Sequence, residues 1–171
     1  MYKRQALNIL LDSLWSKKFE KNQLANKYEA LILASIIEKE AGNNNEKELI
    51  SSVFLKRLEI GMKLQADPTV VYAKKRQAND FDLVIRRVLY KDLEIKSPYN
   101  TYKYRGLPPG PITMPDISSV DAVLNAESHN YLFFVVDPKN PGYHLFASTY
   151  SQHLANRKVY VCWLNENRIM R

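Results

Sequence analysis

Two glutamates, Glu38 and Glu40, end the most apolar stretch of the sequence, residues 31–37. Neither Gly nor Pro occurs between Asn22 and Ala41, so this region predicts a buried helix. A carboxyl group near a helix C-terminus faces the negative end of the helix dipole, which raises its pKa, and burial acts in the same direction. A carboxylic acid that stays protonated near neutral pH can donate a proton to a leaving oxygen, as glycosidic cleavage requires.

Helix geometry distinguishes the two glutamates. On a helix of 3.6 residues per turn, Glu40 shares a face with Ile36 and Ile37, whereas Glu38 projects about 160° away. We therefore expect Glu40 to point towards the core or a cleft, and Glu38 is the alternate candidate. The spacing leaves a second interpretation open, in which both glutamates are surface charges paired with Lys39 or with other basic residues.

A second group of polar residues lies further along the chain. Gln65 and Asp67 end a segment, residues 62–67, in which apolar and polar side chains alternate before Pro68, and this predicts a short strand or an extended segment. Asp67 is either a cap of the following helix or a ligand contact, and the sequence is compatible with both.

A long loop is predicted from Ser97 to Pro115, because seven of these residues are Gly or Pro. It contains four consecutive polar or aromatic residues, Tyr99, Asn100, Thr101 and Tyr102. Tyrosines stack on sugar or base faces, Asn and Thr bind hydroxyls or amides, and prolines keep such a loop rigid. A purely structural loop with packed tyrosines is the alternative.

The remaining reactive side chains exclude several chemistries. The three histidines have no metal-site spacing, although His144, two residues before Phe146 on a predicted strand, is placed where it can face a cleft. The chain has neither a Gly-x-Ser-x-Gly element nor a phosphate-binding glycine loop. Cys162 is the only cysteine, which excludes an internal disulfide, and we expect it to be a packed residue.

Composition indicates one globular domain: the 171 residues are 46% hydrophobic and 25% charged, with a net charge of +7. Residues 74–105 hold nine Lys or Arg against four Asp or Glu. This bias suits a polyanionic partner or is a solvated surface. The longest apolar run is far shorter than the roughly 20 residues that a membrane span needs, and no signal-peptide core follows Met1.

The pattern of apolar residues and breakers predicts an α+β protein that is mostly helical. The expected helices are Tyr2–Lys18, Asn22–Ala41, Glu46–Ile60, Pro68–Lys75, a helix from Asp80 through Leu89, a helix from Ser118 or Ser119 through Leu124, and Thr149–Leu164. For the helix at Glu46–Ile60, we expect Asn45 to be the N-cap and Glu48 its capping-box partner. The expected strands, Tyr131–Val136 and Tyr143–Ala147, form a hairpin around a turn at Pro138–Gly142.

Several segments in one order carry a resemblance to a known family. They are Leu33-Ala-Ser-Ile-Ile-Glu-Lys-Glu40, Val53-Phe-Leu-Lys-Arg-Leu58, Gly61-Met-Lys-Leu-Gln-Ala-Asp-Pro-Thr-Val70, Ser97-Pro-Tyr-Asn-Thr-Tyr102, Gly106-Leu-Pro-Pro-Gly-Pro-Ile112, Tyr131-Leu-Phe-Phe-Val135, His144-Leu-Phe146 and Tyr150-Ser-Gln-His153. Together they resemble the endolytic murein transglycosylase family, the MltG or YceG-like proteins. Departures are small: Ala66 stands where many members have threonine, and the turn at residues 137–142 is poorer in glycine.

The resemblance implies a bacterial lyase of the cell wall, with a mostly helical, lysozyme-like catalytic domain. Such an enzyme cuts the MurNAc-β-1,4-GlcNAc bond inside nascent peptidoglycan strands and leaves 1,6-anhydroMurNAc ends. The family is anchored in the inner membrane by an N-terminal helix that this chain lacks, and it acts on the extracytoplasmic face. We therefore expect residues 1–27 to be the end of a linking region, and residues 28–171 to be the catalytic domain of a longer or truncated protein.

The resemblance places the catalytic carboxyl in the Glu-Lys-Glu element, with Glu40 favoured as a single general acid and base. The substrate's own C6 hydroxyl is then the nucleophile, so no second enzymic carboxylate, metal or cofactor is required. The candidates for saccharide contacts and for ordering that hydroxyl are Gln65, Asp67, Tyr99, Asn100, Thr101, Tyr102, His144 and Phe146. Peptidoglycan synthases are partners expected from the family alone, and no nucleic-acid partner is expected.

Three alternatives stay open. A hydrolase on the same scaffold would position a water molecule and release reducing-end MurNAc. A non-catalytic peptidoglycan-binding module would not depend on Glu40 at all. A nucleic-acid binder is suggested only by the basic charge, and it would show a salt-sensitive affinity.

Overall fold

Three helices pack around one apolar core: α2 (Lys27–Glu40), α3 (Lys47–Glu59) and α5 (Ile117–Asn125). The computed structural model describes residues 11–16, 18, 22–85, 87–126 and 128–167. The other elements are η1 (Asn44–Glu46), α4 (Asp67–Ala78), η2 (Tyr90–Glu94), β1 (Phe133–Val136), β2 (His144–Ala147) and α6 (Tyr150–Glu166). The expected α+β class with a small antiparallel hairpin is confirmed.

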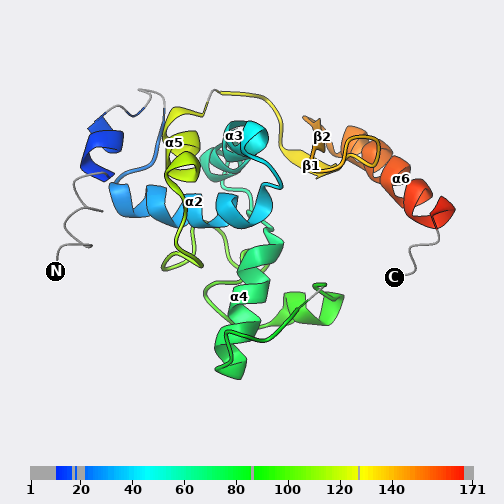
Figure 1. Ribbon diagram of the computed structural model, residues 1–171, viewed down its shortest axis with the longest axis horizontal. Coiled ribbons are helices and arrows are strands. Elements are labelled where there is room, and N and C mark those ends of the chain that lie inside the picture. Colours follow the sequence, from blue (N-terminus) through cyan, green and yellow to red (C-terminus); the bar gives the residue numbers. More distant parts are fainter. Residues whose placement is uncertain (1–10, 17, 19–21, 86, 127, 168–171) are drawn as a thin grey trace.

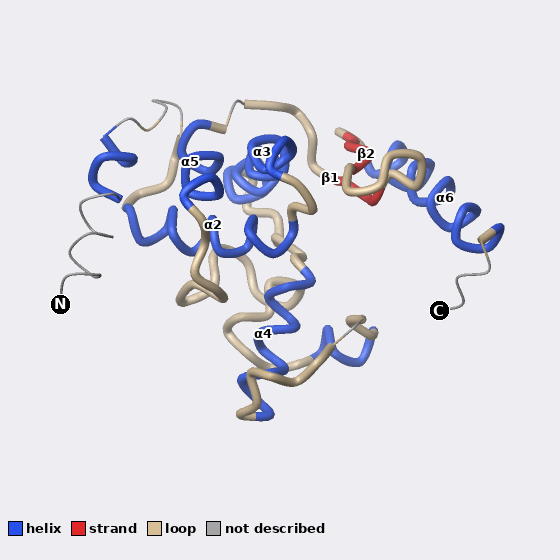
Figure 2. The backbone as a smooth tube through the Cα atoms, viewed as in Figure 1, coloured by secondary structure: helices blue, strands red, loops and turns tan. Residues whose placement is uncertain are grey.

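Figures 1 and 2 show two parts extending from this bundle. Helix α4 extends downwards, with the loops and η2 beside it, whereas the hairpin and α6 lie on the side opposite the N-terminus. Within the described residues, no helix combines the length and the apolar character that a membrane span needs.

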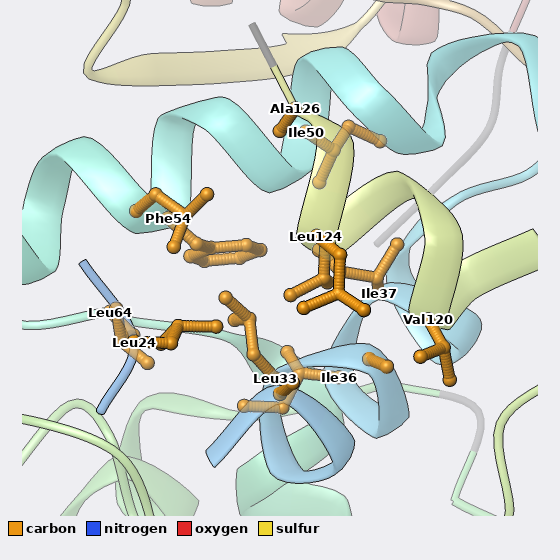
Figure 3. Packing of buried hydrophobic residues seen from close by; sticks show 14 of the residues in the cluster. Leu24, Leu33, Ile36, Ile37, Ile50, Phe54, Leu64, Val120, Leu124 and Ala126 are labelled. Carbon is orange, nitrogen blue, oxygen red and sulfur yellow. The ribbon is translucent and has the colours of Figure 1, made fainter. Parts of the chain in front are cut away.

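Helix α2 is buried on almost every side in its central part. Residues 32–37 are all buried, because α3 and α5 cover one side of the helix and α4 packs against it as well. Leu33, Ile36 and Ile37 point into the space between the helices, where they meet Phe54 of α3 and Leu124 of α5 (Figure 3). Burying side chains of this size removes enough apolar surface from water to hold the three helices together.

The start of α2 differs from the prediction. The helix begins at Lys27, because the side chain of Asn26 accepts a hydrogen bond from Glu29 N and caps it. The preceding residues are extended: Asn22 Nδ2 donates to Val123 O at 2.6 Å, and Leu24 belongs to the core. The proposed domain division after residue 27 stays a prediction, although the packed unit includes residues that precede it.

The connection between α2 and α3 also differs from the prediction. Asn43, not Asn45, is the capping residue, and it caps η1 by accepting a hydrogen bond from Glu46 N at 3.2 Å. Glu46 is not a solvated first-turn charge. Its buried carboxylate accepts from His144 N at 2.9 Å and lies 2.8 Å from His144 Nδ1, so it fastens the hairpin to the helical bundle.

The hairpin has the predicted strands and turn. Phe133 pairs with Ala147 and Val136 with His144, and α6 packs against both strands. Thr149 and Gln152 form a capping box at the start of α6, as expected for the helix predicted from Thr149. Cys162 on this helix is exposed, so the expectation that it is packed is wrong.

Two further segments differ from regular structure. The sequence predicts a short strand or an extended segment at residues 62–67; residues 62–66 form no strand, and Gln65 N donates to Thr101 O of a loop. No helix forms between Asp80 and Leu89 in the described residues, since Asp80 Oδ1 accepts from the backbone N–H groups of residues 82 and 83 and holds a turn. The predicted first helix is described only at residues 11–16, which are helical, and its start lies outside the described residues.

One buried serine joins the proline-rich loop to α2 and provides a test of the fold. Ser35 Oγ donates to Ile32 O at 2.7 Å and accepts from Ile112 N at 3.0 Å. We expect Ser35→Ala to lower the free energy of unfolding by about 1 kcal/mol, because the Ile112 N–H loses its partner while alanine slightly favours the helix. Urea unfolding measures this, and Ser151→Ala on exposed α6 is the matched control, expected to change stability little. If Ser35→Ala and Ser151→Ala lower the free energy of unfolding equally, the hydrogen bond between Ser35 and Ile112 does not stabilise the fold.

Candidate active site

Glu40, the last residue of α2, lines a pocket of about 610 Å³. Its side chain is half-buried, since the core covers the helix behind it and the start of α4 lies beside it. Asp67 and Pro68, the first residues of α4, line the same pocket, together with Ile112 of the proline-rich loop. Three segments that are distant in the sequence therefore meet around one carboxyl group.

The surroundings of Glu40 favour its neutral form. Burial is the main cause and the negative charge of Asp67 is the second, and together they raise the pKa of Glu40 to about 8. The positive charge of Arg57 and the backbone N–H of Asp67 act in the opposite direction, but they do not outweigh burial. Glu40 is therefore protonated at neutral pH and can act as a general acid towards a molecule in the pocket.

Glu38 has the opposite environment. Burial alone would raise its pKa, but hydrogen bonds from Ser119 and Lys47 and from the backbone N–H of Asp116 outweigh it, and the pKa is lowered. Lys47 Nζ lies 3.2 Å from its carboxylate, and the Asp116 N–H lies 3.3 Å away at the start of α5. The expectation that the helix end raises the pKa of both glutamates is thus wrong for Glu38, which joins α2 to α3 and α5 as a charged group.

Asp67 and Tyr102 form a hydrogen-bonded pair beside Glu40. Tyr102 Oη donates to Asp67 Oδ1 at 2.5 Å, and burial together with this bond raises the pKa of Tyr102. Gln65 is exposed and has a φ of 52°, a left-handed conformation that non-glycine residues rarely adopt. Such strain is found most often at functional sites, so the Gln65–Asp67 segment is held in an unusual conformation next to the acid.

Asn100 and Thr101 lie behind the pocket and form internal hydrogen bonds. Asn100 is fully buried, and its Nδ2 donates to Leu93 O at 2.8 Å and to Ile95 O at 3.0 Å. Thr101 Oγ1 accepts from Ala66 N at 3.0 Å. Both residues position the Gln65–Asp67 segment and Tyr102, and a direct contact with saccharide stays a prediction for each.

The other predicted contact residues are not among the residues that line the pocket. Tyr99 is buried, and its ring lies 4.6 Å from that of Tyr72, which does line it. His144 is bonded to Glu46, and Phe146 packs against Phe134 in the hairpin, so neither is brought beside Glu40. Their proposed saccharide contacts stay predictions.

Arg57 is a site residue that the sequence analysis did not select. Its buried guanidinium donates from Nε to Leu132 O at 2.7 Å and from Nη1 to Leu64 O, and its charge acts on both Glu40 and Tyr102. Burial lowers the pKa of Arg57 from its ordinary value, and its neighbours oppose that shift. The sequence held a signal for Arg57, because this charged residue follows Phe54 by three positions and therefore lies on the buried face of α3, where charged side chains are rare.

Other residues that line the pocket were not selected from the sequence either. Tyr72 and Lys75 of α4 line it, as do Phe81 and Arg87 of the following segment and Lys39 of α2. The described residues contain no cluster of three or more side chains suited to bind a metal ion. The pocket therefore combines a protonated acid with basic and aromatic side chains.

Comparison with known proteins gives consistent matches. The chain is 40% identical over 152 residues to an endolytic murein transglycosylase of Bacillus subtilis, covering 89% of this chain and 39% of that protein. A Streptococcus pneumoniae protein of the same name is 33% identical over 132 residues, which is 77% of this chain and 23% of the relative. A crystal structure of a yceG-like protein from Listeria monocytogenes matches with a TM-score of 0.72 and 38% identity, over 90% of this chain and 45% of that one.

The chain spans less than half the length of each of these relatives. The model of the YceG-like family matches residues 1–159, which is most of the sequence. The chain therefore belongs to the YceG-like family.

Proposed function

We propose that this chain carries the catalytic part of an endolytic peptidoglycan lytic transglycosylase, with Glu40 as general acid and base. The main observation in support is a carboxyl group with a pKa of about 8 that lines a pocket of about 610 Å³. The relatives named endolytic murein transglycosylases support the choice of peptidoglycan as substrate. The bond is MurNAc-β-1,4-GlcNAc, and the product carries a 1,6-anhydroMurNAc end.

In the first step, protonated Glu40 donates its proton to the glycosidic oxygen as the bond to the muramic C1 breaks. The resulting carboxylate then accepts the proton of the substrate's C6 hydroxyl, whose oxygen closes the anhydro ring on C1. Proton and electron pair balance without water, and Glu40 returns to its acid form. An intramolecular nucleophile has a high effective concentration, so the enzyme mainly has to hold the sugar in the reactive geometry.

The neighbours of Glu40 suit both halves of this cycle. The positive charge of Arg57 favours the carboxylate that forms after proton donation, and burial together with Asp67 favours return of the proton. Asp67 is exposed and keeps one carboxylate oxygen in the hydrogen bond from Tyr102. Its other oxygen is suited to accept from a sugar hydroxyl and to orient it.

Hydrolysis is the second candidate, and the position of Asp67 favours it. The sequence indicated no second carboxylate for Glu40, whereas in the structure Asp67 is close enough for its charge to raise the pKa of Glu40. An acid and a base that are both carboxyl groups are the usual arrangement in glycosidases that use water. The products separate the two reactions, since hydrolysis gives reducing-end MurNAc.

The setting of the enzyme is proposed from the family resemblance. We infer that the longer protein acts on the extracytoplasmic face of the inner membrane, and that association with peptidoglycan synthases involves the longer protein. A non-catalytic peptidoglycan-binding module has less support, because a binding module does not need a neutral carboxylic acid in its pocket.

Substitution of the two glutamates tests the mechanism. We expect Glu40→Gln to reduce glycan cleavage roughly 100- to 10,000-fold, the usual contribution of a general acid, while the fold is retained because a neutral amide replaces a neutral acid. Glu38→Gln should keep most of the cleavage but lower the free energy of unfolding by about 2 kcal/mol, because the ion pair with buried Lys47 is lost and the hydrogen bonds to the half-buried Glu38 are weakened. Mass spectrometry of digested peptidoglycan and urea unfolding measure the two effects.

These measurements also decide between the alternatives. Inactive Glu38→Gln with active Glu40→Gln would reverse the assignment. Cleavage unchanged in both variants would favour a binding module or another catalytic group. Reducing-end MurNAc in place of anhydroMurNAc would show that the reaction is hydrolysis.

The pH dependence of kcat/KM tests the protonation state of Glu40. Because the pKa is raised to about 8, the acid form persists through neutral pH, and kcat/KM should fall about tenfold per pH unit above pH 8. Asp67→Asn removes a negative charge that raises this pKa, so the decline should begin at lower pH in that variant. Asp121→Asn, an exposed change of the same kind on α5, should leave the profile in place. If kcat/KM declines at the same pH in the wild type and in both variants, Asp67 does not affect the titration of Glu40.

A further inference from the structure

Part of the basic bias of residues 74–105 lies at the pocket. Lys75 and Arg87 from this region line it, and Lys39 of α2 completes a set of three cations. Two other basic residues of the region are paired with carboxylates: Lys74 lies 2.7 Å from Asp92, and Lys103 lies 3.8 Å from Glu94. By contrast, none of the three pocket cations forms an ion pair with a carboxylate of the described residues.

The acidic groups at the pocket do not neutralise these three cations. Glu40 is uncharged at neutral pH, and Asp67 accepts the hydrogen bond from Tyr102. Asp80, in the turn after α4, does not line the pocket, and its Oδ1 accepts from the backbone N–H of residue 82 at 3.0 Å. At neutral pH the pocket therefore presents three positive charges and one negative charge.

One of the three cations, Lys75, is held in place by a hydrogen bond to the segment that follows α4. Lys75 Nζ donates to Phe81 O at 2.9 Å, which holds the end of that side chain against the following segment. The ring of Tyr72 lies 5.8 Å from that of Phe81, and both residues line the same pocket. Figure 1 shows this part of the chain, the green ribbon from α4 onwards, extending beyond the helical bundle.

A peptidoglycan strand offers a matching anion. Each muramic acid carries a lactyl arm that ends either in a free carboxylate or in a stem peptide, which itself bears carboxylates. When a muramic sugar is bound at Glu40, this arm extends from the same residue whose C1 reacts. We propose that Lys39, Lys75 and Arg87 bind carboxylates carried on the lactyl arm of the muramic acid, so that the pocket selects strands that are negatively charged at this arm. This inference rests on the proposed function, because it assigns the substrate of the same pocket.

The test compares strands that differ only in charge. Native peptide-bearing strands are compared with strands whose carboxylates have been converted to neutral amides by a carbodiimide and methylamine. We expect wild-type kcat/KM to be roughly fivefold lower on the amidated strands, because partly exposed ion pairs contribute little each and several act together. In Lys75→Gln/Arg87→Gln the ratio between the two substrates should approach one.

Matched variants separate this effect from general changes in charge. Lys96→Gln removes one exposed positive charge from the same region outside the pocket and should keep the fivefold ratio. Lys75→Arg keeps the charge and should also keep it. A ratio near one in the wild type, or an unchanged ratio in the double variant, would overturn the inference.

Equilibrium binding to the Glu40→Gln protein separates this inference from the proposed function. Wild-type protein that cleaves neither substrate would contradict the catalytic proposal. The anion site still stands in that case if strand binding to the Glu40→Gln protein weakens on amidation and when Lys75→Gln/Arg87→Gln is added. If binding is indifferent to amidation, the anion site fails whatever the catalysis shows.

Two further arms identify the source of the anion. Strands stripped of stem peptides by an amidase keep the lactyl carboxylate, and they are compared with the same strands after amidation. If the protein still prefers the charged form, the site binds the lactyl carboxylate. If this preference is lost, the site binds the carboxylates of the stem peptide. Vesicles of phosphatidylglycerol form the last arm. If vesicle binding needs Lys75 and Arg87 but strand binding does not, the pocket cations bind a membrane surface, and the inference is overturned.

Discussion

The buried helix α2 ends in a half-buried carboxyl group, Glu40, at the edge of the core, and this placement links the fold to the site. Glu40 follows six consecutive buried residues of α2, so the packing that stabilises the bundle also desolvates the acid. A charged group at this place would be costly, and protonation removes that cost. The function proposed for the pocket and the stability of the bundle therefore arise from the same contacts between α2, α3 and α5.

The two glutamates of α2 show that a neighbour can outweigh the helix dipole. Both lie in the last turn, where the dipole disfavours negative charge. Glu38, however, meets the first turn of α5 and a buried lysine, and it stays charged. Glu40 also meets a helix start, at Asp67, but that helix brings a carboxylate with it and the favourable N–H is opposed. Two residues apart, the same chemical group is thus a structural anion in one case and an acid in the other.

Local sequence signals accounted for much of the fold but not for its exceptions. The apolar stretch of α2, the breakers of the proline-rich loop and the capping box of α6 are local patterns, and each predicted its element. The helix expected after Asp80 and the cap expected at Asn45 failed because other local side-chain bonds formed instead: Asp80 holds a turn, and Asn43 caps η1. At the site, helix geometry favoured Glu40, whereas Arg57 was missed because its role depends on carbonyl groups of two distant loops.

Arg57 shows why those distant loops occur together. Its guanidinium binds Leu132 O just before the hairpin and Leu64 O just before the Gln65–Asp67 segment, and it lies 5.6 Å from the ring of Phe133. A planar group with several fixed donors can hold two backbone segments at once, which a lysine cannot do in the same geometry. One buried cation therefore ties the hairpin to the strained turn beside Glu40, and its charge moderates the pKa of the acid that it helps to position. Because both effects come from one side chain, the geometry and the protonation of the site are physically coupled.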